Sequence, residues 1–380
     1  MPGRERGMTI PVLYVLQSLD IGGTQRQLLF LLKGLDRRTF PCVIACDRLG
    51  ELAPDFEALG AVLIVLRGGR RRWRDPRGWL RRAWEVFRIV RRHRIRIVHS
   101  QWPLYALFGT LAGWAAGAPV RLLSIHGHWL RPTDRRILRV LRPFLTAIVE
   151  GTPGCIDRLV AQGVPRRAFR LIDYGVDGSL YDDSGLPARA RRRLGVPDDA
   201  YVVTRVSRCF PDKGVGDVVE AAALVLDKAA NAWFLVVGDG DELPRLVARA
   251  RELGLGERVI FTGFYANLHE VLAASDVLTM TSRLDELGLA TLEALAAAKP
   301  VVAYQNGAII AEAVHHGENG LLLPGGDVRA LADALVVLHA DAPLRARMGR
   351  AARRLYESRY GLDAFGRRMG ELYGQLVGRR

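Results

Sequence analysis

The sequence has few cysteines and no recognisable disulfide or metal-binding pattern. Its 380 residues include only Cys42, Cys46, Cys155 and Cys209. Their spacing matches neither a structural zinc site nor the cysteine framework of small secreted domains. We therefore expect four reduced thiols in the core, and we expect neither a metal nor another cofactor.

The sequence also lacks a segment typical of export or of a membrane span. The amino terminus, MPGRERGMTIPVLYVL, has no signal-peptide cleavage pattern, and its apolar part is expected to form a first strand. The apolar run 104–120 is too short and too rich in small residues to span a bilayer. We expect a cytoplasmic protein that is at most peripheral on the cytoplasmic membrane face.

Acidic residues are scarce only in the first half of the chain. Residues 1–200 hold 34 Lys and Arg against 18 Asp and Glu, a balance of +16, whereas residues 201–380 hold 21 against 22, a balance of −1. The two halves are therefore expected to meet different partners.

Short apolar runs alternate with helical patterns along the whole chain. This alternation predicts an α/β protein with parallel sheets covered by helices. The expected strands of the first half are 10–16, 40–46, 61–66, 95–100, 120–125 and 145–150. Those of the second half are 200–207, 232–238, 258–263, 276–282 and 299–304.

Each set of strands is long enough for its own sheet, so we predict two Rossmann-like, doubly wound domains facing across a cleft. The charged, Pro- and Gly-marked segment 183–199 is the expected linker between domains 1–182 and 200–360. Residues 361–380 are expected to form a last helix that packs back on the first domain. In this architecture ligands bind at the carboxyl ends of the strands.

The stretch VSRCFPDKGVGDVV combines two cations with glycines before a helix. Arg208 follows an expected strand, and Lys213 lies in a loop with Gly214 and Gly216. Cations at a helix amino terminus, with close backbone approach, suit a pyrophosphate. The alternative interpretation is a loop with solvated charges.

The stretch LDELGLATLEALAAA places carboxylates in a run that otherwise resembles a buried helix. Asp285 and Glu286 precede Gly288, and Glu293 lies in the second turn. A carboxylate can accept two hydrogen bonds from a ribose diol, and a helix start offers N–H groups to a phosphate. Asp285 for a second hydroxyl-rich group and Glu293 for a ribose would form a sugar-nucleotide site. The alternative is a helix cap and a rim charge.

The order and spacing of several motifs resemble glycosyltransferase family 4, whose members are retaining enzymes of the GT-B fold. The resemblance covers most of the chain and rests on IGGTQRQLLFLLKGL, SIHGHW, DYGVDGSLYD, SRCFPDKG, VVGDGDEL, IFTGFYANLHEVLAASDVL, DELGLATLEALAAAKPVVA and GENGLLLPGGD. It implies a metal-independent transferase that takes a nucleotide-diphosphate-sugar donor. The implied acceptor is a glycan or glycolipid, as in polysaccharide or lipopolysaccharide biosynthesis.

The resemblance also implies roles for single residues. Arg208 and Lys213 would bind the donor diphosphate, Glu293 its ribose, and Asp285 and His126 the transferred sugar. The donor phosphate and sugar would also be contacted by the backbone of Gly22, Gly23, Gly288, Leu289 and Ala290. The loop that begins with Gly263 and Phe264 is expected to read the base.

The chain departs from the family pattern at several positions. Asp285 replaces the usual first Glu, Leu287 the usual Phe, and Tyr174 the commoner Asn. Because of these changes, the resemblance does not determine the identity of the donor sugar. The alternatives are a nucleotide-sugar 2-epimerase and a non-catalytic basic binding protein.

The segment 67–96 holds 13 arginines and predicts a basic surface. In the helix expected from Pro76, Leu80 and Trp84 lie on an apolar face that is expected to be core. Arginines occupy the other face. The residues expected to meet a glycolipid acceptor or an anionic membrane are Arg70, Arg71, Arg72, Trp73 and Arg81. A merely solvated face and nucleic acid are the alternatives, and the sequence has no nucleic-acid-binding motif.

Overall fold

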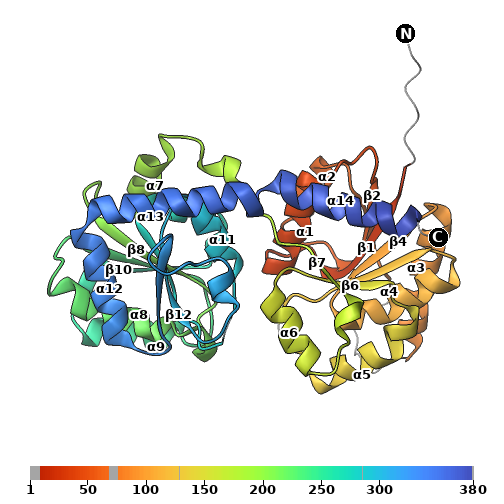
Figure 1. The fold of residues 1–380 in the computed structure, drawn as a ribbon, viewed down its shortest axis with the longest axis horizontal. Coiled ribbons are helices and arrows are strands. Elements are labelled where there is room, and N and C mark those ends of the chain that lie inside the picture. The colour runs from red at the N-terminus through yellow and green to blue at the C-terminus, as the bar shows by residue number, and fades with distance from the viewer. Residues whose placement is uncertain (1–8, 68–75, 128, 285, 379–380) are drawn as a thin grey trace, which may run out of the picture. The chain divides into compact units, whose positions relative to one another are not determined.

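The computed structural model describes residues 9–67, 76–127, 129–284 and 286–378, and the chain divides into two compact units (Figure 1). The first unit comprises Met1–Gly175 and Leu362–Arg380, and the second comprises Val176–Gly361. No helix among the described residues combines the length and the apolar character needed to cross a membrane.

The first unit is built on a parallel sheet of seven strands. The strands are β1 (Val12–Ser18), β2 (Cys42–Arg48), β3 (Val62–Val65), β4 (Ile97–Gln101), β5 (Val120–Ser124), β6 (Ala147–Glu150) and β7 (Phe169–Leu171). The helices are α1 (Gly23–Gly34), α2 (Ala53–Ala58), α3 (Pro76–Arg92), α4 (Pro103–Ala115), α5 (Pro132–Leu141), α6 (Pro153–Ala161) and α14 (Leu362–Gly378). The order β3-β2-β1-β4-β5-β6-β7 reverses direction between β1 and β4.

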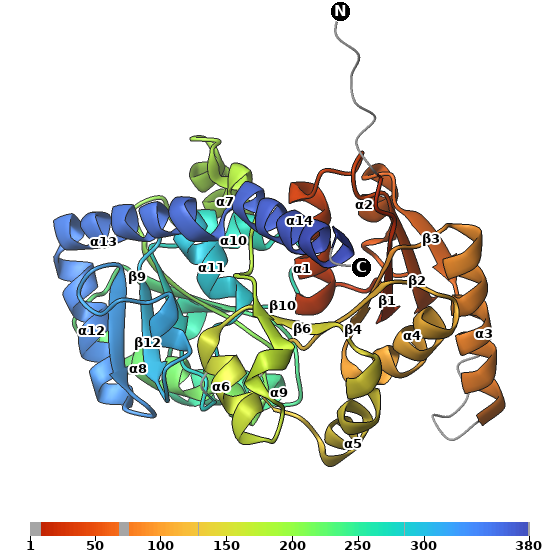
Figure 2. The same cartoon turned by 45° about the vertical axis from the view of Figure 1, so that its right-hand side comes forward.

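Alternating side chains of β1 supply the cores on the two faces of this sheet. Tyr14 and Leu16 pack with α1, α2 and α14, whereas Leu13 and Val15 pack with α3 and α4. The helices α3, α4 and α5 contact one another in sequence (Figure 2). The sheet is therefore covered on both faces, as the near-continuous apolar strands predicted.

The last helix, α14, belongs to the first unit and contacts α1. It follows a π-helical turn over Tyr356–Tyr360. The buried hydroxyl of Tyr373 lies 3.0 Å from the Tyr14 hydroxyl and 2.7 Å from His99 Nδ1. A polar chain inside the core thus fixes α14 against β1 and β4.

The second unit repeats the architecture with six parallel strands. They are β8 (Tyr201–Val206), β9 (Ala232–Val237), β10 (Val259–Gly263), β11 (Val277–Met280), β12 (Val301–Gln305) and β13 (Gly320–Pro324). The helices are α7 (Leu186–Leu194), α8 (Val215–Leu226), α9 (Leu243–Glu252), α10 (Leu268–Ala274), α11 (Leu289–Ala296), α12 (Val328–Ala340) and α13 (Ala342–Leu355). The order β10-β9-β8-β11-β12-β13 reverses direction between β8 and β11.

The prediction of two doubly wound parallel sheets is confirmed, and the structure adds two strands that we did not expect. Both β7 and β13 lie at a sheet edge. β7 has three residues and leaves Leu171 exposed, and β13 begins with Gly320 and ends with Pro324. Such short edge strands carry too little apolar signal to be recognised from sequence.

The segment 183–199 was expected to be a linker, but it includes α7 within the second unit. Its apolar residues Leu186 and Ala190 are buried, and α7 contacts α10. Arg191 pairs with Asp276 at 3.0 Å. The structure places the changes of unit at Gly175/Val176 and Gly361/Leu362.

The expected burial of α3 is wrong at two positions. Leu80 is 72% exposed and Trp84 is 58% exposed, although Val86 and Val90 are buried. The buried side of α3 is therefore rotated toward Val86, and Trp84 stacks on Phe87 with 5.4 Å between the ring centroids. The apolar residues of α3 thus include an exposed pair, Leu80 and Trp84, that no part of the described chain covers.

Candidate functional site

The second unit brings the predicted anion-binding residues to the point where its strand order reverses. Lys213 lies in the loop after β8, and Glu286 lies in the loop after β11, the neighbouring strand across the reversal. Open α/β sheets bind ligands at this place because the loops on either side diverge there. The two loops are joined by a direct contact between these side chains.

Lys213 and Glu286 form a two-pronged ion pair. Lys213 Nζ donates to Glu286 Oε1 at 2.8 Å and to Oε2 at 2.7 Å. Ser282 Oγ donates to Glu286 Oε1 at 2.6 Å. Burial opposes the charged form of Glu286, but Lys213, Ser282 and Arg205 outweigh it and lower the pKa of the carboxyl. Lys213 is therefore held by an internal anion at the place predicted for a phosphate.

A second cation, Arg205, lies fully buried on β8 below this pair. Its guanidinium donates to the carbonyl of Lys213 at 2.7 Å and to Ser282 Oγ at 3.1 Å. Burial lowers the pKa of Arg205 to about 10, against the opposing effect of Glu286, so it stays charged at neutral pH. The sequence analysis missed Arg205, because this residue lies within an apolar strand and is not part of a loop motif. The same analysis gave Glu286 no role.

Two glycines allow the loops to approach one another. Gly214 has φ +60°, and a Cβ there would lie 2.0 Å from the carbonyl oxygen of Thr281. Gly238 has φ +130°, and a Cβ there would lie 1.9 Å from the carbonyl oxygen of Ser207. Only glycine fits both requirements. The GDG turn after β9 therefore allows close packing of the loops.

Helix α11 begins beside this cluster with the predicted backbone segment Gly288, Leu289 and Ala290. Gly288 is the N-cap with φ +67°, and its missing Cβ leaves room for Met280. The first N–H groups of a helix have no intrahelical acceptor and attract anions. Glu293 lies in the second turn and is buried, with 4% of its surface exposed. A rim charge is therefore a poor description of Glu293.

Other predicted donor-site residues lie further out on the same edge of the sheet. Arg208 is exposed, and its guanidinium lies 5.0 Å from the ring centroid of Phe210. In the described part of the chain no carboxylate pairs with Arg208. Gly263 ends β10 with φ +64°, and Phe264 is 61% exposed. An exposed aromatic side chain at a strand end is suited to stacking on a planar ligand.

In the first unit, predicted residues also gather where the strand order reverses. Gly22 and Gly23 start α1 directly after β1. The loop after β4 is tied to this helix start because Trp102 Nε1 donates to Thr24 Oγ1 at 3.2 Å. Trp102 has φ +71°, a strained conformation for a bulky residue. Gly22 itself is extended, so its φ does not require glycine.

His126 follows β5 and is half-buried. Its Nε2 lies 2.5 Å from Gln101 Oε1, and since this oxygen only accepts, Nε2 carries the proton and Nδ1 is an acceptor. Burial lowers the pKa of His126 to about 4. The imidazole is therefore neutral at physiological pH and suited to hydrogen bonding with a neutral hydroxyl-bearing ligand.

Tyr174 and Glu150 support His126, a role that sequence reasoning did not assign. The rings of His126 and Tyr174 are stacked with 6.2 Å between centroids. Tyr174 OH donates to the buried Glu150 carboxylate at 3.0 Å. A Cβ at Gly151 would lie 2.4 Å from the Tyr174 ring. The departure from the commoner Asn at this position thus places a flat wall beside the imidazole.

Several predicted residues lie outside the described residues: Asp285, Arg70, Arg71, Arg72 and Trp73. Arg81 is described, and its exposed side chain lies 3.7 Å from Glu85 on the same helix. Asp239 and Asp241 have the Asp-x-Asp spacing of some metal sites, but Asp239 Oδ1 accepts from the backbone of Gly240. Within the described ranges no group of three His, Cys, Asp or Glu is arranged to hold a metal ion.

Comparisons with known proteins match both units. The family model described as Glycosyl transferases group 1 matches residues 188–355, and the one described as Glycosyl transferase 4-like domain matches residues 22–175.

Two relatives and one solved structure illustrate the range of matches. The alpha-D-kanosaminyltransferase of Streptomyces kanamyceticus is 31% identical over 222 residues, 58% of this chain but only 56% of that protein. The GDP-mannose-dependent alpha-(1-6)-phosphatidylinositol monomannoside mannosyltransferase of Mycolicibacterium smegmatis is 32% identical over 309 residues, 77% of this chain and 79% of that protein. The crystal structure of Anabaena HepE in complex with UDP superposes with a TM-score of 0.83 at 23% identity, covering 96% of this chain and 100% of that one.

Proposed function

This chain belongs to the Glycosyl transferases group 1 family and is an enzyme of the hexosyltransferase type, and from this premise we propose that it moves a sugar from a nucleotide-diphosphate-sugar donor to a glycan or lipid-linked acceptor. We further propose that transfer retains the anomeric configuration and needs no metal ion. The observation that carries the donor assignment is the cluster of Lys213, Glu286 and the start of α11 where the strand order of the second sheet reverses.

Stabilisation of the departing diphosphate is the main chemical task of this cluster. As the bond between the sugar and the diphosphate breaks, negative charge grows on the phosphate. Lys213 and Arg208 would compensate that charge, and the first N–H groups of α11 would donate to it. Because Lys213 is paired with Glu286 in the free protein, the donor phosphate has to replace that carboxylate as its partner.

The remaining groups would orient the donor. Glu293 would accept hydrogen bonds from the ribose, and Phe264 would lie near the base. Asp285 and the neutral His126 would contact the transferred sugar. With no carboxylate assigned as a nucleophile, retention is expected to follow from front-face displacement. The acceptor oxygen then bonds to the anomeric carbon on the side from which the diphosphate leaves, and a phosphate oxygen takes the acceptor proton.

The acceptor side is proposed to lie on the basic first half of the chain. We propose that Arg70, Arg71, Arg72, Trp73 and Arg81 contact an anionic membrane or a glycolipid acceptor. The exposed Leu80 and Trp84 on α3 support this proposal, because a helix that presents both arginines and large apolar side chains suits a membrane interface. The name of the mycobacterial relative likewise refers to a lipid-linked acceptor.

A donor-turnover assay tests the proposed reaction. The protein is incubated with UDP-, GDP- and ADP-linked glucose and mannose, in water alone or with an added acceptor. Transfer of the sugar to water or to the acceptor is followed by the release of nucleoside diphosphate, with and without EDTA. We expect release from at least one donor, unaffected by EDTA, with the α-anomer as the first sugar product in the NMR spectrum. A β-anomer as first product would exclude retention, and activity lost in EDTA would exclude metal independence.

A further inference from the structure

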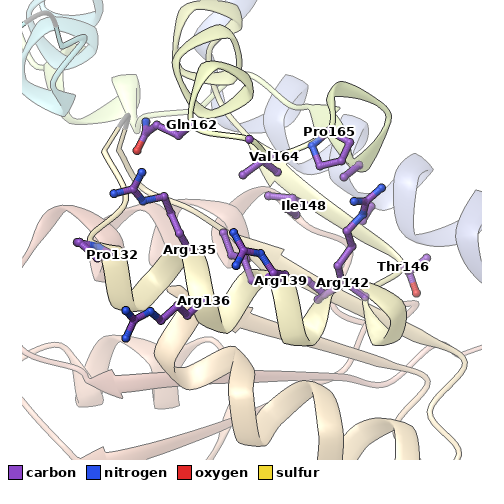
Figure 3. A pocket seen from close by; sticks show the side chains of 15 residues that line it. Pro132, Arg135, Arg136, Arg139, Arg142, Thr146, Ile148, Gln162, Val164 and Pro165 are labelled. Carbon is purple, nitrogen blue, oxygen red and sulfur yellow. The ribbon is translucent and has the colours of Figure 1, made fainter.

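A groove on the first unit lies away from the residues assigned above. It has a volume of about 390 Å³ and runs between α5 and the segment Gln162–Pro165 (Figure 3). Its floor includes Ala147 and Ile148 at the amino end of β6, whereas Glu150 and the wall beside His126 are at the opposite, carboxyl end of that strand. The groove is therefore separate from the residues proposed to bind the sugar.

Four arginines of α5 and its carboxyl end line this groove, and all but Arg136 share one face of the helix. Arg135, Arg139 and Arg142 are spaced by four and three residues, which places them on that face. Figure 3 shows their side chains extending toward the segment Gln162–Pro165. All three are exposed, and among the described residues no carboxylate forms an ion pair with any of them. Like charges at this spacing repel one another, so the cluster costs stability unless an anion occupies it.

The floor of the groove is apolar. Leu138 on α5, Ile148 on β6 and Val164 after α6 are buried in one core cluster and line the groove from below. A site that combines three unpaired cations with an apolar trench is matched to an anion that carries a hydrocarbon chain. An inorganic anion would leave the trench unused.

The surface around the groove is also apolar in places. Val140 on α5 is 59% exposed, and Trp114 on the adjoining α4 is 55% exposed. Trp114 lies edge-on to Phe144, which directly follows Arg142 and Pro143. Tryptophan beside arginine is typical of protein surfaces at the headgroup level of a bilayer.

We propose that this groove is a binding site for an anionic phospholipid of the membrane. Arg135, Arg139 and Arg142 bind the headgroup phosphate, and the start of an acyl chain lies along Leu138, Ile148 and Val164. The site goes beyond the proposed sugar transfer and does not depend on it. It would anchor the first unit to an anionic bilayer through α5, in addition to any contact made by α3.

The chemistry of the lining favours a lipid over the other polyanions. The residues lining the groove include no aromatic side chain on which a nucleobase could stack. An acidic peptide would need partners for its backbone N–H and C=O groups, and the apolar floor offers none. A phospholipid has its charge at one end and no polar group along its chain, which fits the lining.

Vesicle co-sedimentation tests the proposal. The probe is vesicles of phosphatidylcholine with about 30% phosphatidylglycerol, and the variants are the triple change R135E/R139E/R142E and the single change Ala168→Phe. Ala168 lines the groove, so the larger side chain fills the trench without changing the charge. We expect the triple change to weaken binding by at least about tenfold and Ala168→Phe to weaken it by about threefold or more.

The matched control is R347E/R350E/R354E on α13 of the second unit. These arginines are exposed and are spaced by three and four residues, the reverse of the order on α5. Because three arginines become glutamates in both variants, the change in net charge is the same. The control is expected to bind vesicles as the unchanged protein does, and the melting temperature of each variant reports folding. Equal weakening by the control, or full binding by the triple variant, would overturn the proposal. If Ala168→Phe binds vesicles as tightly as the unchanged protein, the arginines form a basic surface without a site for an acyl chain, and the proposal is wrong. Tighter binding of an acidic peptide than of vesicles would likewise overturn it, because the partner would then be a protein.

Discussion

At the scale of single residues, the pair of Lys213 and Glu286 is the feature that most affects how the proposed donor site works. An ammonium without a partner in a partly buried loop would be costly, and Glu286 removes that cost in the free protein. The same carboxylate competes with any phosphate that approaches Lys213. Affinity for a nucleotide therefore depends on the free energy needed to break the ion pair between Glu286 and Lys213.

Replacement of Glu286 by Gln is expected to strengthen nucleotide binding. The amide keeps the shape but not the charge, so Lys213 exchanges a weaker partner for the phosphate. We expect the Kd of the preferred nucleoside diphosphate to fall by about three- to tenfold. The stability of the free protein should fall by about 1–3 kcal/mol because two cations lose their anion. Isothermal titration calorimetry and urea unfolding measure the two effects.

Glu220→Gln is the matched control for this prediction, because Glu220 forms an ion pair with Arg249 on the surface of the same unit. It removes one carboxylate charge and should leave nucleotide affinity unchanged. Weaker nucleotide binding by Glu286→Gln would mean that Glu286 helps to bind the donor rather than competing with it.

The buried His99 predicts a loss of stability in acid. Burial lowers its pKa from the ordinary 6.5 to about 3. Between pH 6.5 and pH 3 the His99 imidazole is protonated in the unfolded chain but neutral in the native chain. The free energy of unfolding therefore falls as the pH falls toward 3 and levels off below that. The slope approaches about 1.4 kcal/mol per pH unit for one proton. Burial of His126, with its pKa lowered to about 4, adds a second term of the same sign.

The His99→Gln variant should lose this part of the pH dependence. Glutamine does not titrate, so between pH 7 and pH 5 its free energy of unfolding should fall by about 2 kcal/mol less than that of the unchanged protein. Urea unfolding of the first unit at both pH values measures the difference. The same pH dependence in both proteins would show that His99 is not buried in its neutral form.

At the scale of elements, the loops at the carboxyl ends of β8 and β9 require glycines that no other residue replaces. Their positive φ values coincide with close approaches of backbone to backbone. The alternation of apolar strands and helices was sufficient to predict both sheets, because buried parallel strands are strongly apolar. It was insufficient for β7, β13 and the exposed pair Leu80 and Trp84 on α3. These lie at edges and surfaces, where apolar periodicity and burial are not coupled.

Gly214→Ala is expected to damage the proposed donor site. A methyl group there would lie 2.0 Å from the Thr281 carbonyl, in addition to the unfavourable φ of +60°. The loop has to move, and we expect a stability cost of about 2–4 kcal/mol together with weaker nucleotide binding. Gly256 is the control, since it has φ +54° but open space around it. Gly256→Ala should cost only about 1 kcal/mol and leave binding intact. Equal costs in thermal unfolding would contradict the close approach of the two loops.

The site itself was predicted unevenly from sequence. The motifs located Lys213, Gly288 and Glu293 because their order along the chain is distinctive. Arg205 was not recognised, and Tyr174 was noted only as a departure from the family pattern, since the roles of both depend on contacts between segments far apart in the sequence. Glu286 was noticed as a charge in an apolar run, but only the structure identifies Lys213 as its partner.

At the scale of the whole molecule, two α/β units of similar architecture carry different charge and different candidate sites. The excess of positive charge is confined to the first 200 residues. The reversal of strand order in the second sheet holds the proposed donor site. This division predicts that nucleotide binding stabilises the second unit and that membrane binding involves the first.

A thermal-shift panel with UDP, GDP, ADP, CMP and dTDP, each with and without EDTA, tests the donor site most directly. At one hundred times its Kd a ligand adds about 2.7 kcal/mol to the stability, which corresponds to a shift of roughly 5 °C or more for a unit of this size. We predict that one nucleoside diphosphate stands out, that EDTA has no effect, and that Lys213→Ala and Glu293→Ala abolish the shift. A panel with no shift for any nucleotide, or a shift that both variants retain, would contradict a donor site between Lys213 and α11.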